Sequence, residues 1–320
     1  MNRYARQMIL PEVGTDGQAS LMDARILVVG AGGLAAPALP LLTGAGVGHL
    51  TVLDRDVISL SNLHRQTLFT EKDCGQPKAE TAAARCRALN GGVSVTAENT
   101  ALTSANADGF VSGADVVLDC ADSYAASYTL SDTCFKLGKP LISASVLGLS
   151  GYVGGFCGGM PSLRAVFPDA PDSGASCATA GVLGPMVAIM GAMQAQMALN
   201  LILGVAPSPL GYVVRLDART LRTSGFRFDA APEPAGHFPF VAASMLSAQD
   251  VIVELRDPTE APTPAHPLAR RVSLDTLKSE PNKQKRLALC CATGLRAWRA
   301  AEQVTPDWPG EIVLVAASTS

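Results

Sequence analysis

Short apolar runs rich in β-branched residues alternate with longer helical stretches over the first half of the chain. Residues 24–30 (ARILVVG) predict a fully buried strand, and residues 32–44 predict the helix that follows it. Such alternation is typical of a parallel sheet with crossover helices, so the pattern predicts a doubly wound, Rossmann-like α/β domain. The other predicted elements are strands over 49–54, 93–98, 114–120 and 140–145 and helices over 78–89 and 127–137.

The character of the sequence changes near Asp229, where DAAPEPAGHFP predicts a stiff linker. Beyond it, a strand within 247–257, a buried strand over 287–291 and a helix over 294–304 predict a small α/β module. We therefore expect three parts, which are a first domain over 1–230, a linker over 231–240 and a second domain over 241–320.

One uncharged segment, residues 178–203, is long enough to span a membrane. Three glycines and Pro185 interrupt it, and three polar amide side chains would lack partners in hydrocarbon. Those amides belong to Gln194, Gln196 and Asn200. The segment therefore predicts a buried core or dimer-interface helix that starts near Pro185, and we expect no membrane partner.

Composition narrows the class of protein further. The 320 residues are 48% apolar and 17% charged, which excludes a disordered chain. The net charge is −3 and Lys and Arg form no block, so we expect no nucleic-acid partner. Eight scattered cysteines without an apparent secretion signal favour a reducing, cytoplasmic location. No Cys-x-x-Cys pair occurs, so we expect no zinc site.

Glycines follow the first predicted strand at Gly30, Gly32 and Gly33, where backbone must turn sharply or approach a phosphate. Asp54, at the end of the next strand, lies where a carboxylate accepts hydrogen bonds from ribose hydroxyls. These residues predict a nucleotide site. They leave ATP and NAD as alternatives, because Gly30-x-Gly32-x-x-Ala35 also fits the dinucleotide fingerprint.

Polar residues follow the other strand ends, and in a doubly wound sheet these positions converge on one crevice. Arg65 and Lys78 are suited to neutralise a triphosphate, and Asp122 is suited to hold Mg²⁺. A dehydrogenase has no evident need of them, so they favour ATP. The stretches are Asp54-Arg55-Asp56, Ser61-Asn62-Leu63-His64-Arg65-Gln66, Gly75-Gln76-Pro77-Lys78 and Asp119-Cys120-Ala121-Asp122.

Ordered motifs between Arg3 and Phe228 resemble those of the E1-like adenylyltransferases of the ThiF/MoeB/HesA type. The resemblance implies an E1-type domain with a mixed sheet. It also implies a homodimer that uses ATP and Mg²⁺ to adenylate the C-terminal glycine of a ubiquitin-like, Gly-Gly-ended sulfur carrier of the ThiS/MoaD type, for thiamine or molybdopterin synthesis. The matching motifs are Arg3-Tyr4-Ala5-Arg6-Gln7, the Gly30 loop, Asp54-x-Asp56, Asn62-x-x-Arg65-Gln66, Gly75-x-Pro77-Lys78, Asp119-x-x-Asp122 and Ser176-Cys177-Ala178-Thr179-Ala180-Gly181-Val182.

Carried over position by position, the resemblance implies a role for each matching residue. Arg6 would reach the phosphates of the neighbouring subunit. The chain also departs from the family, because Ser162-Leu163-Arg164-Ala165 replaces the first zinc-binding Cys pair and serines replace an Asn and an Arg at Ser123 and Ser127. The implied nucleotide set is Asp54 for the ribose, Asn62, Arg65 and Lys78 for the phosphates, Asp122 for magnesium, and Asp56 and Gln66 beside them.

Two cysteines are candidate nucleophiles. Cys177 precedes the long apolar helix and matches the family cysteine that attacks the acyl adenylate or forms an acyl disulfide with the carrier. Cys291 lies between a strand and a helix, and Cys291-x-x-Gly294-x-Arg296 resembles the rhodanese active loop. Residues 241–320 therefore resemble a rhodanese module that stops before that family's closing region, and a cysteine desulfurase is an expected partner.

Two other functions stay open on the residues alone. The glycine fingerprint with Asp54 also suits a nicotinamide-dependent oxidoreductase. The lost zinc ligands, with Ser123 and Ser127, also suit a scaffold that binds a carrier without catalysis. The sequence does not name the carrier, and it does not tell whether Cys291 is active.

Overall fold

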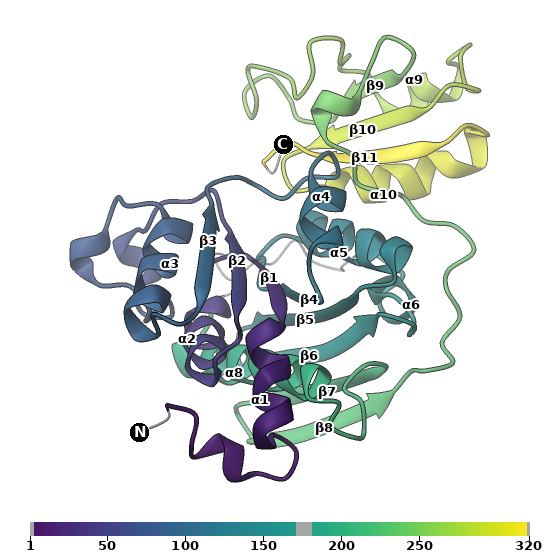
Figure 1. Ribbon diagram of the computed structural model, residues 1–320. Coiled ribbons are helices and arrows are strands. Elements are labelled where there is room, and N and C mark those ends of the chain that lie inside the picture. Colours follow the sequence, from purple (N-terminus) through teal and green to yellow (C-terminus); the bar gives the residue numbers. More distant parts are fainter. Residues whose placement is uncertain (1–2, 171–180, 319–320) are drawn as a thin grey trace.

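The computed structural model describes residues 3–170 and 181–318, which form two β-sheets (Figure 1). The larger sheet has the strand order β3-β2-β1-β4-β5-β6-β7-β8, and the smaller has the order β11-β10-β9. The strands are β1 (Arg25–Val29), β2 (His49–Leu53), β3 (Ser94–Glu98), β4 (Val116–Asp119), β5 (Pro140–Leu147), β6 (Ser150–Cys157), β7 (Tyr212–Asp217), β8 (Arg222–Arg227), β9 (Val251–Glu254), β10 (Leu287–Cys291) and β11 (Ile312–Ala316).

Helices cover both faces of the larger sheet and one face of the smaller (Figure 1). The helices are α1 (Gly14–Asp23), α2 (Ala35–Ala45), α3 (Lys78–Leu89), α4 (Ala107–Ser112), α5 (Tyr124–Leu137), α6 (Leu163–Val166), α8 (Gly184–Ile202), α9 (Leu274–Lys278) and α10 (Leu295–Val304). Short 3-10 turns are η1 (Gln7–Ile9), η2 (Leu60–Asn62), η3 (Glu71–Asp73), η4 (Ala243–Met245) and η5 (Thr305–Asp307).

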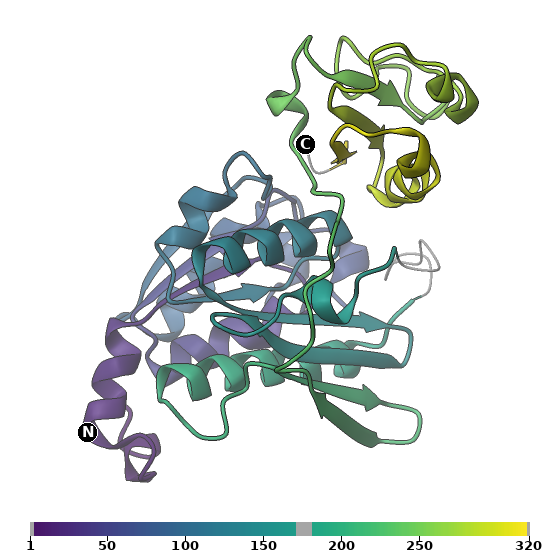
Figure 2. The same ribbon diagram turned by 90° about the vertical axis from the view of Figure 1, so that its right-hand side faces the viewer.

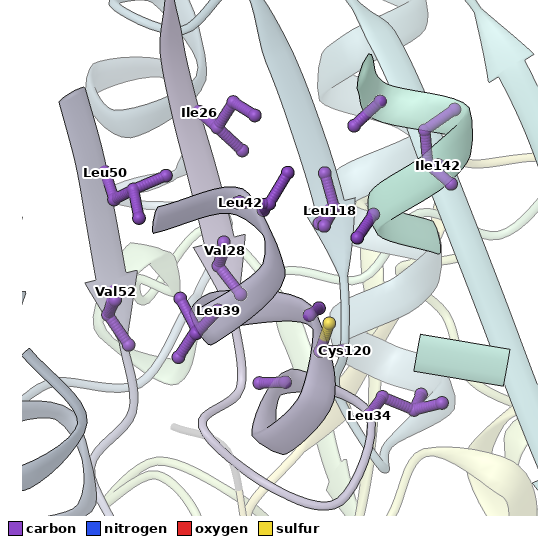
Figure 3. Packing of buried hydrophobic residues seen from close by; sticks show 14 of the residues in the cluster. Ile26, Val28, Leu34, Leu39, Leu42, Leu50, Val52, Leu118, Cys120 and Ile142 are labelled. Carbon is purple, nitrogen blue, oxygen red and sulfur yellow. The ribbon is translucent and has the colours of Figure 1, made fainter. Parts of the chain in front are cut away.

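The first five strands of the sheet confirm the doubly wound prediction. β1 pairs in parallel with β2 and with β4, so Val28 lies opposite Val52 and Leu118. Successive side chains of a strand point to opposite faces, and the four apolar residues of β1 after the exposed Arg25 therefore fill two cores. Ile26 and Val28 pack with α2 and α8 (Figure 3), whereas Leu27 and Val29 face α4 and α5.

The other three strands make the sheet mixed, as the family resemblance implied. β6, β7 and β8 add to β5 in antiparallel order. The alternating pattern along the sequence does not predict β8, because all six of its residues are exposed and mostly polar. Antiparallel edge strands of this kind take their conformation from backbone pairing rather than from burial.

Two helix boundaries differ from the sequence-based prediction for local reasons. α2 begins at Ala35 rather than at residue 32, because Gly32 and Gly33 belong to the turn after β1. α5 begins at Tyr124, three residues earlier than predicted, because the Ser123 hydroxyl accepts a hydrogen bond from the Ala126 amide and caps the helix.

The long apolar segment folds as α8, which begins at Gly184 with Pro185 in its first turn, as predicted. Among the described residues it is the one helix whose length and composition would suffice to cross a membrane. Its buried side chains, such as Met186 and Met190, pack into the core between α2 and the sheet. The segment is therefore a core helix of this fold.

The chain between the two sheets, residues 228–242, runs along the surface of the larger one (Figure 2). The Glu233 carboxylate accepts hydrogen bonds from the Ser162 amide and hydroxyl, each at 2.6 Å. Further on, the Leu314 amide donates to the Pro239 carbonyl at 2.9 Å. The segment predicted as a linker is therefore attached to both sheets.

The two sheets share one hydrophobic cluster, and Arg164 lies at their junction. This residue is 2% exposed, and its guanidinium donates to both carboxylate oxygens of Asp132 at 2.6 and 2.9 Å. The guanidinium carbon lies 4.7 Å from the Tyr128 ring centroid and 5.6 Å from that of Trp298, on α10. Where the family resemblance places a Cys pair, this chain thus has a buried ion pair between aromatic rings.

We expect Arg164→Met to lower the free energy of unfolding by about 3 kcal/mol, because it leaves the partly buried Asp132 carboxylate without its partner. Chemical denaturation checks this. The matched control is Lys136→Met on α5, whose exposed ion pair with Asp108 contributes about 1 kcal/mol at most. Equal losses in the two variants would contradict the account.

Candidate functional site

The turn after β1 brings three strand ends together at the backbone level. Gly30 has φ +92°, and its amide donates to the Leu53 carbonyl at the end of β2. A Cβ added at Gly30 would lie 2.5 Å from the carbonyl oxygen of Cys120, just after β4. Both the left-handed backbone and this close approach require glycine. Gly30 therefore holds the ends of β1, β2 and β4 in contact.

Asp54 and Asp56 follow β2 and face this turn. The Asp54 carboxylate accepts hydrogen bonds from the Ala31 amide and the Asp56 amide, each at 2.7 Å. Burial raises the pKa of Asp54, while these hydrogen bonds and the positive charge of Lys78 oppose that rise. The carboxylate thus lies at the glycine turn, where the sequence predicted a ribose contact.

Lys78 is the first residue of α3, and its side chain returns to the same strand end. Its ammonium lies 2.9 Å from the Asp56 carboxylate, and its amide donates to the Asp56 carbonyl. The lysine is buried, whereas the Asp56 side chain is 56% exposed. The ammonium is therefore a fixed point charge at the edge of the site.

The segment 59–66 lies beside the second and third glycines. Asn62 closes a capping box with Ser59 at η2. Arg65 is half-buried and donates to the Ser61 carbonyl at 3.3 Å. A Cβ added at Gly33 would lie 3.4 Å from the Arg65 Cγ. The segment is thus held against the glycine turn by backbone turns and side-chain packing.

Gln66 is 3% exposed, and its Oε1 is buried without a hydrogen-bond partner within the described residues. Its Nε2 lies 3.6 Å from the position of a Cβ added at Gly32. An unpaired buried carbonyl oxygen is costly, so its place beside the glycine turn favours a role toward a ligand.

Asp119 ends β4 and anchors the loop that carries Asp122. Its carboxylate accepts hydrogen bonds from the Ser143 hydroxyl at 2.8 Å and from the Ala121 amide at 3.2 Å. Burial raises the pKa of Asp119 to about 6, although hydrogen bonds from Ser127 and Ser143 oppose the rise. Asp122 itself is exposed, one residue before the cap of α5.

Two predicted residues, Arg6 and Cys291, are not in this group. The neighbour of Arg6, Gln7, donates to the Ala45 carbonyl, so Arg6 lies near the C-terminal end of α2. This helix has 11 residues and is about 16 Å long, and the glycine turn is at its other end. Cys291 belongs to the smaller sheet. Cys177 lies outside the described residues.

The site fits a nucleotide by its donor set. Gly32 has no atom nearer than the Gln66 Nε2, at 3.6 Å, on the side where a Cβ would lie; Asp54 offers carboxylate oxygens, and Lys78 supplies positive charge. Asp122 supplies a carboxylate of the kind that Mg²⁺ prefers together with phosphate oxygens. Within residues 3–170 and 181–318, no group of three His, Cys, Asp or Glu residues is arranged to hold a metal by itself.

The comparison with family models identifies the class of protein. Residues 4–235 match the ThiF family, so the chain belongs to this family. A relative from Thermus thermophilus, a sulfur carrier protein adenylyltransferase, is 42% identical over 226 residues, which are 68% of this chain and 83% of the relative. An adenylyltransferase and sulfurtransferase MOCS3 from Drosophila grimshawi is 41% identical over 229 residues. That match covers 70% of this chain, and the chain spans about half (51%) of that relative.

Among solved structures, Escherichia coli MccB in complex with MccA-N7isoASN superposes with a TM-score of 0.66. The match covers 73% of this chain and 74% of that one at 20% identity. It confirms the mixed, Rossmann-like fold and carries no further conclusion.

The raised pKa of Asp119 predicts a pH effect on stability. Between pH 4 and 6 this carboxyl ionises in the unfolded chain before it does so in the folded protein, so its contribution to stability falls as pH rises through this window. Asp119→Asn removes the effect. We expect the stability of the Asn variant relative to the unsubstituted protein to increase by about 2 kcal/mol from pH 4 to 7, as measured by urea unfolding. A difference independent of pH would contradict this assignment.

Proposed function

We propose that the chain uses ATP to adenylate the C-terminal carboxylate of a sulfur-carrier protein. The observation that carries the proposal is the contact of three strand ends, through Gly30, beside Asp54 and Lys78. The relative from Thermus thermophilus, most of whose length this chain covers, is a sulfur carrier protein adenylyltransferase and supports the same activity. The family assignment disfavours the oxidoreductase alternative.

In this reaction a carboxylate oxygen of the carrier attacks the α-phosphorus of ATP. A new P–O bond forms, the bond between the α-phosphorus and the bridging oxygen breaks, and pyrophosphate leaves with the electron pair. Negative charge grows on the leaving group, so a cation fixed in advance stabilises the transition state more than the ground state. The buried Lys78 ammonium is such a cation, and the exposed Asp56 carboxylate that holds it can move aside.

Other residues that follow the strand ends would bind the ribose, the phosphates and Mg²⁺. Asp54 would accept hydrogen bonds from the ribose, while Asn62 and Arg65 would contact the phosphates, with Gln66 beside them. Asp122 would hold Mg²⁺, because its exposed carboxylate follows β4 at the same edge. When bound, the ion would supply positive charge to the phosphate oxygens.

We also propose that the active form is a homodimer. Arg6 lies at the end of α2 that is remote from its own glycine turn, so it would serve the site of a second copy. Apolar side chains at Ile9, Leu183 and Ile189 are exposed by 73, 59 and 42% and would be covered on association. Cys177 remains the predicted cysteine that attacks the acyl adenylate.

For residues 241–320 we propose a rhodanese-like second domain with Cys291 as its sulfur acceptor. The Cys291 sulfur accepts hydrogen bonds from the Gly294 amide at 3.1 Å and the Ala297 amide at 3.4 Å, at the N-terminus of α10. Such amides stabilise a thiolate or persulfide. A cysteine desulfurase would supply the sulfur. The seven described cysteines are free thiols, which supports a cytoplasmic location.

The adenylation proposal is tested by ATP–pyrophosphate exchange with purified Gly-Gly-ended carriers. We expect Lys78→Ala and Asp122→Ala each to lower exchange at least about 100-fold, because each removes charge that acts on the triphosphate. Lys72→Ala is the matched control, since Lys72 is exposed on the nearby η3, and it should leave exchange unchanged.

Exchange that survives both substitutions would remove Lys78 and Asp122 from the site. Carrier binding without any pyrophosphate release by the unsubstituted protein would instead favour the non-catalytic scaffold.

The sulfur-transfer proposal is tested with thiosulfate and cyanide. Cys291 would take the sulfane sulfur and release sulfite, and cyanide would then take the sulfur as thiocyanate. We expect Cys291→Ser to abolish thiocyanate formation. Cys290→Ser is the control, because burial raises the pKa of Cys290 to about 12 and the thiol faces the opposite core. Thiocyanate formation by the Cys291 variant would contradict the proposal.

A further inference from the structure

One face of α8 lies against the loops that form the candidate nucleotide site. A Cβ added at Gly184 would lie 2.5 Å from the carbonyl oxygen of His64, within the segment that carries Arg65. A Cβ added at Gly33 would lie 2.7 Å from Cγ1 of Val187. These approaches leave no space between the first turns of α8 and either loop, so a shift of the helix would displace both.

The contacts continue along the same face of the helix. Gly191 packs directly on the carbonyl oxygen of Leu34, beside the start of α2. Residues 184, 187, 191 and 194 are separated by three, four and three positions, a spacing that places them on one side of an α-helix. α8 therefore runs past the 59–66 segment, the glycine turn and the start of α2 as one rigid element, and its next contact is made by Gln194.

Gln194 joins α8 to the end of β4 and to Ile142 within β5. The side chain is fully buried, and its amide nitrogen donates to the Asp119 carbonyl at 2.8 Å and to the Ile142 carbonyl at 3.2 Å. Its Oε1 accepts a hydrogen bond from the Cys120 thiol at 3.4 Å. Figure 3 shows the Cys120 sulfur at the carboxyl end of β4. Both amide hydrogens and the carbonyl oxygen thus have partners on adjacent strands.

A buried amide is not needed for the stability of an apolar core helix. Burying the amide costs free energy that its hydrogen bonds only offset. Replacing it by an apolar side chain of equal size can therefore leave the free energy of unfolding nearly unchanged. The amide instead fixes the orientation of α8, because its hydrogen bonds set the rotation and height of the helix against the end of β4 and against β5. The end of β4, at Asp119, begins the loop that carries Asp122.

We propose that Gln194 is a positioning residue for nucleotide activation, because it sets the register of α8 and thereby aligns the Asp122 loop with the glycine turn and the Arg65 segment. The inference rests on the proposed adenylation. Misplacement of reacting groups by about 1 Å can lower a rate about 100-fold, so a loss of this register is measurable.

The test uses Gln194→Met, which keeps the side-chain volume and removes both donors. The matched control is Gln196→Met, because Gln196 is exposed on the same helix and bonds only to Asn200 among the described side chains. In ATP–pyrophosphate exchange with a ThiS-type carrier, we expect kcat of the Gln194 variant to fall at least tenfold and that of the control to stay within twofold. The melting temperature reports stability separately.

A binding readout separates this inference from the proposed function. In calorimetry with ATP alone, the affinity of the Gln194 variant should lie within twofold of that of the unsubstituted protein. The increase in ATP affinity on adding Mg²⁺ should be at least fivefold smaller in the variant. If the unsubstituted protein shows no exchange, the proposed function fails. The increase in ATP affinity on adding Mg²⁺ then tests the role of Gln194 by itself. Gln194→Glu keeps the acceptor for Cys120 but has at most one of the two donors, so losses in the same direction are expected should the Met variant not fold.

Two results would overturn the inference. The first is an unchanged kcat and an unchanged Mg²⁺-dependent gain in a folded Gln194 variant. The second is the loss of cooperative unfolding in both the Met and the Glu variant, which would show that Gln194 serves folding alone.

Discussion

The close approach of Gly30 to the backbone of Cys120 is the constraint on which the rest of the site depends. No side chain fits between the turn after β1 and the end of β4, so these two strand ends are held at contact distance. The Ala31 amide then reaches Asp54, and β2 brings Asp56 to Lys78. Charge, donors and acceptors from separate stretches of sequence are thereby fixed in place before any ligand arrives, which is the condition for electrostatic stabilisation of a developing charge.

The parallel half of the sheet could be predicted from sequence because its central strands, β1 and β4, carry runs of apolar residues that are buried on both faces. The candidate site followed from it, since parallel strands end at one edge and the polar residues follow those ends. β8 could not be predicted, because its exposed residues carry no burial pattern. The starts of α2 at Ala35 and of α5 at Tyr124 also differed from the prediction. They are set by a glycine turn and by a serine cap, which the hydrophobic periodicity of the sequence does not reveal.

Contacts between distant residues were also beyond the sequence. Nothing in the stretch Ser162-Leu163-Arg164-Ala165 indicates that Arg164 would pair with Asp132 and lie between Tyr128 and Trp298. This buried pair and the shared hydrophobic cluster make the smaller sheet part of the same packed body as the larger one. Gln194 gave one signal, which was a polar amide in an apolar helix, but its partners on β4 and β5 became visible only in the structure.

The most direct test of the account follows the α-phosphate of ATP. In the proposed reaction the α-phosphorus of ATP is attacked, so a carrier incubated with the protein and ATP labelled at the α-position should acquire the label as a hydroxylamine-sensitive acyl adenylate, with release of unlabelled pyrophosphate. ATP labelled at the γ-position should leave the carrier unlabelled. Transfer of the γ-label to the carrier, with ADP as the other product, would contradict adenylation and would require a different arrangement of the nucleotide at the strand ends.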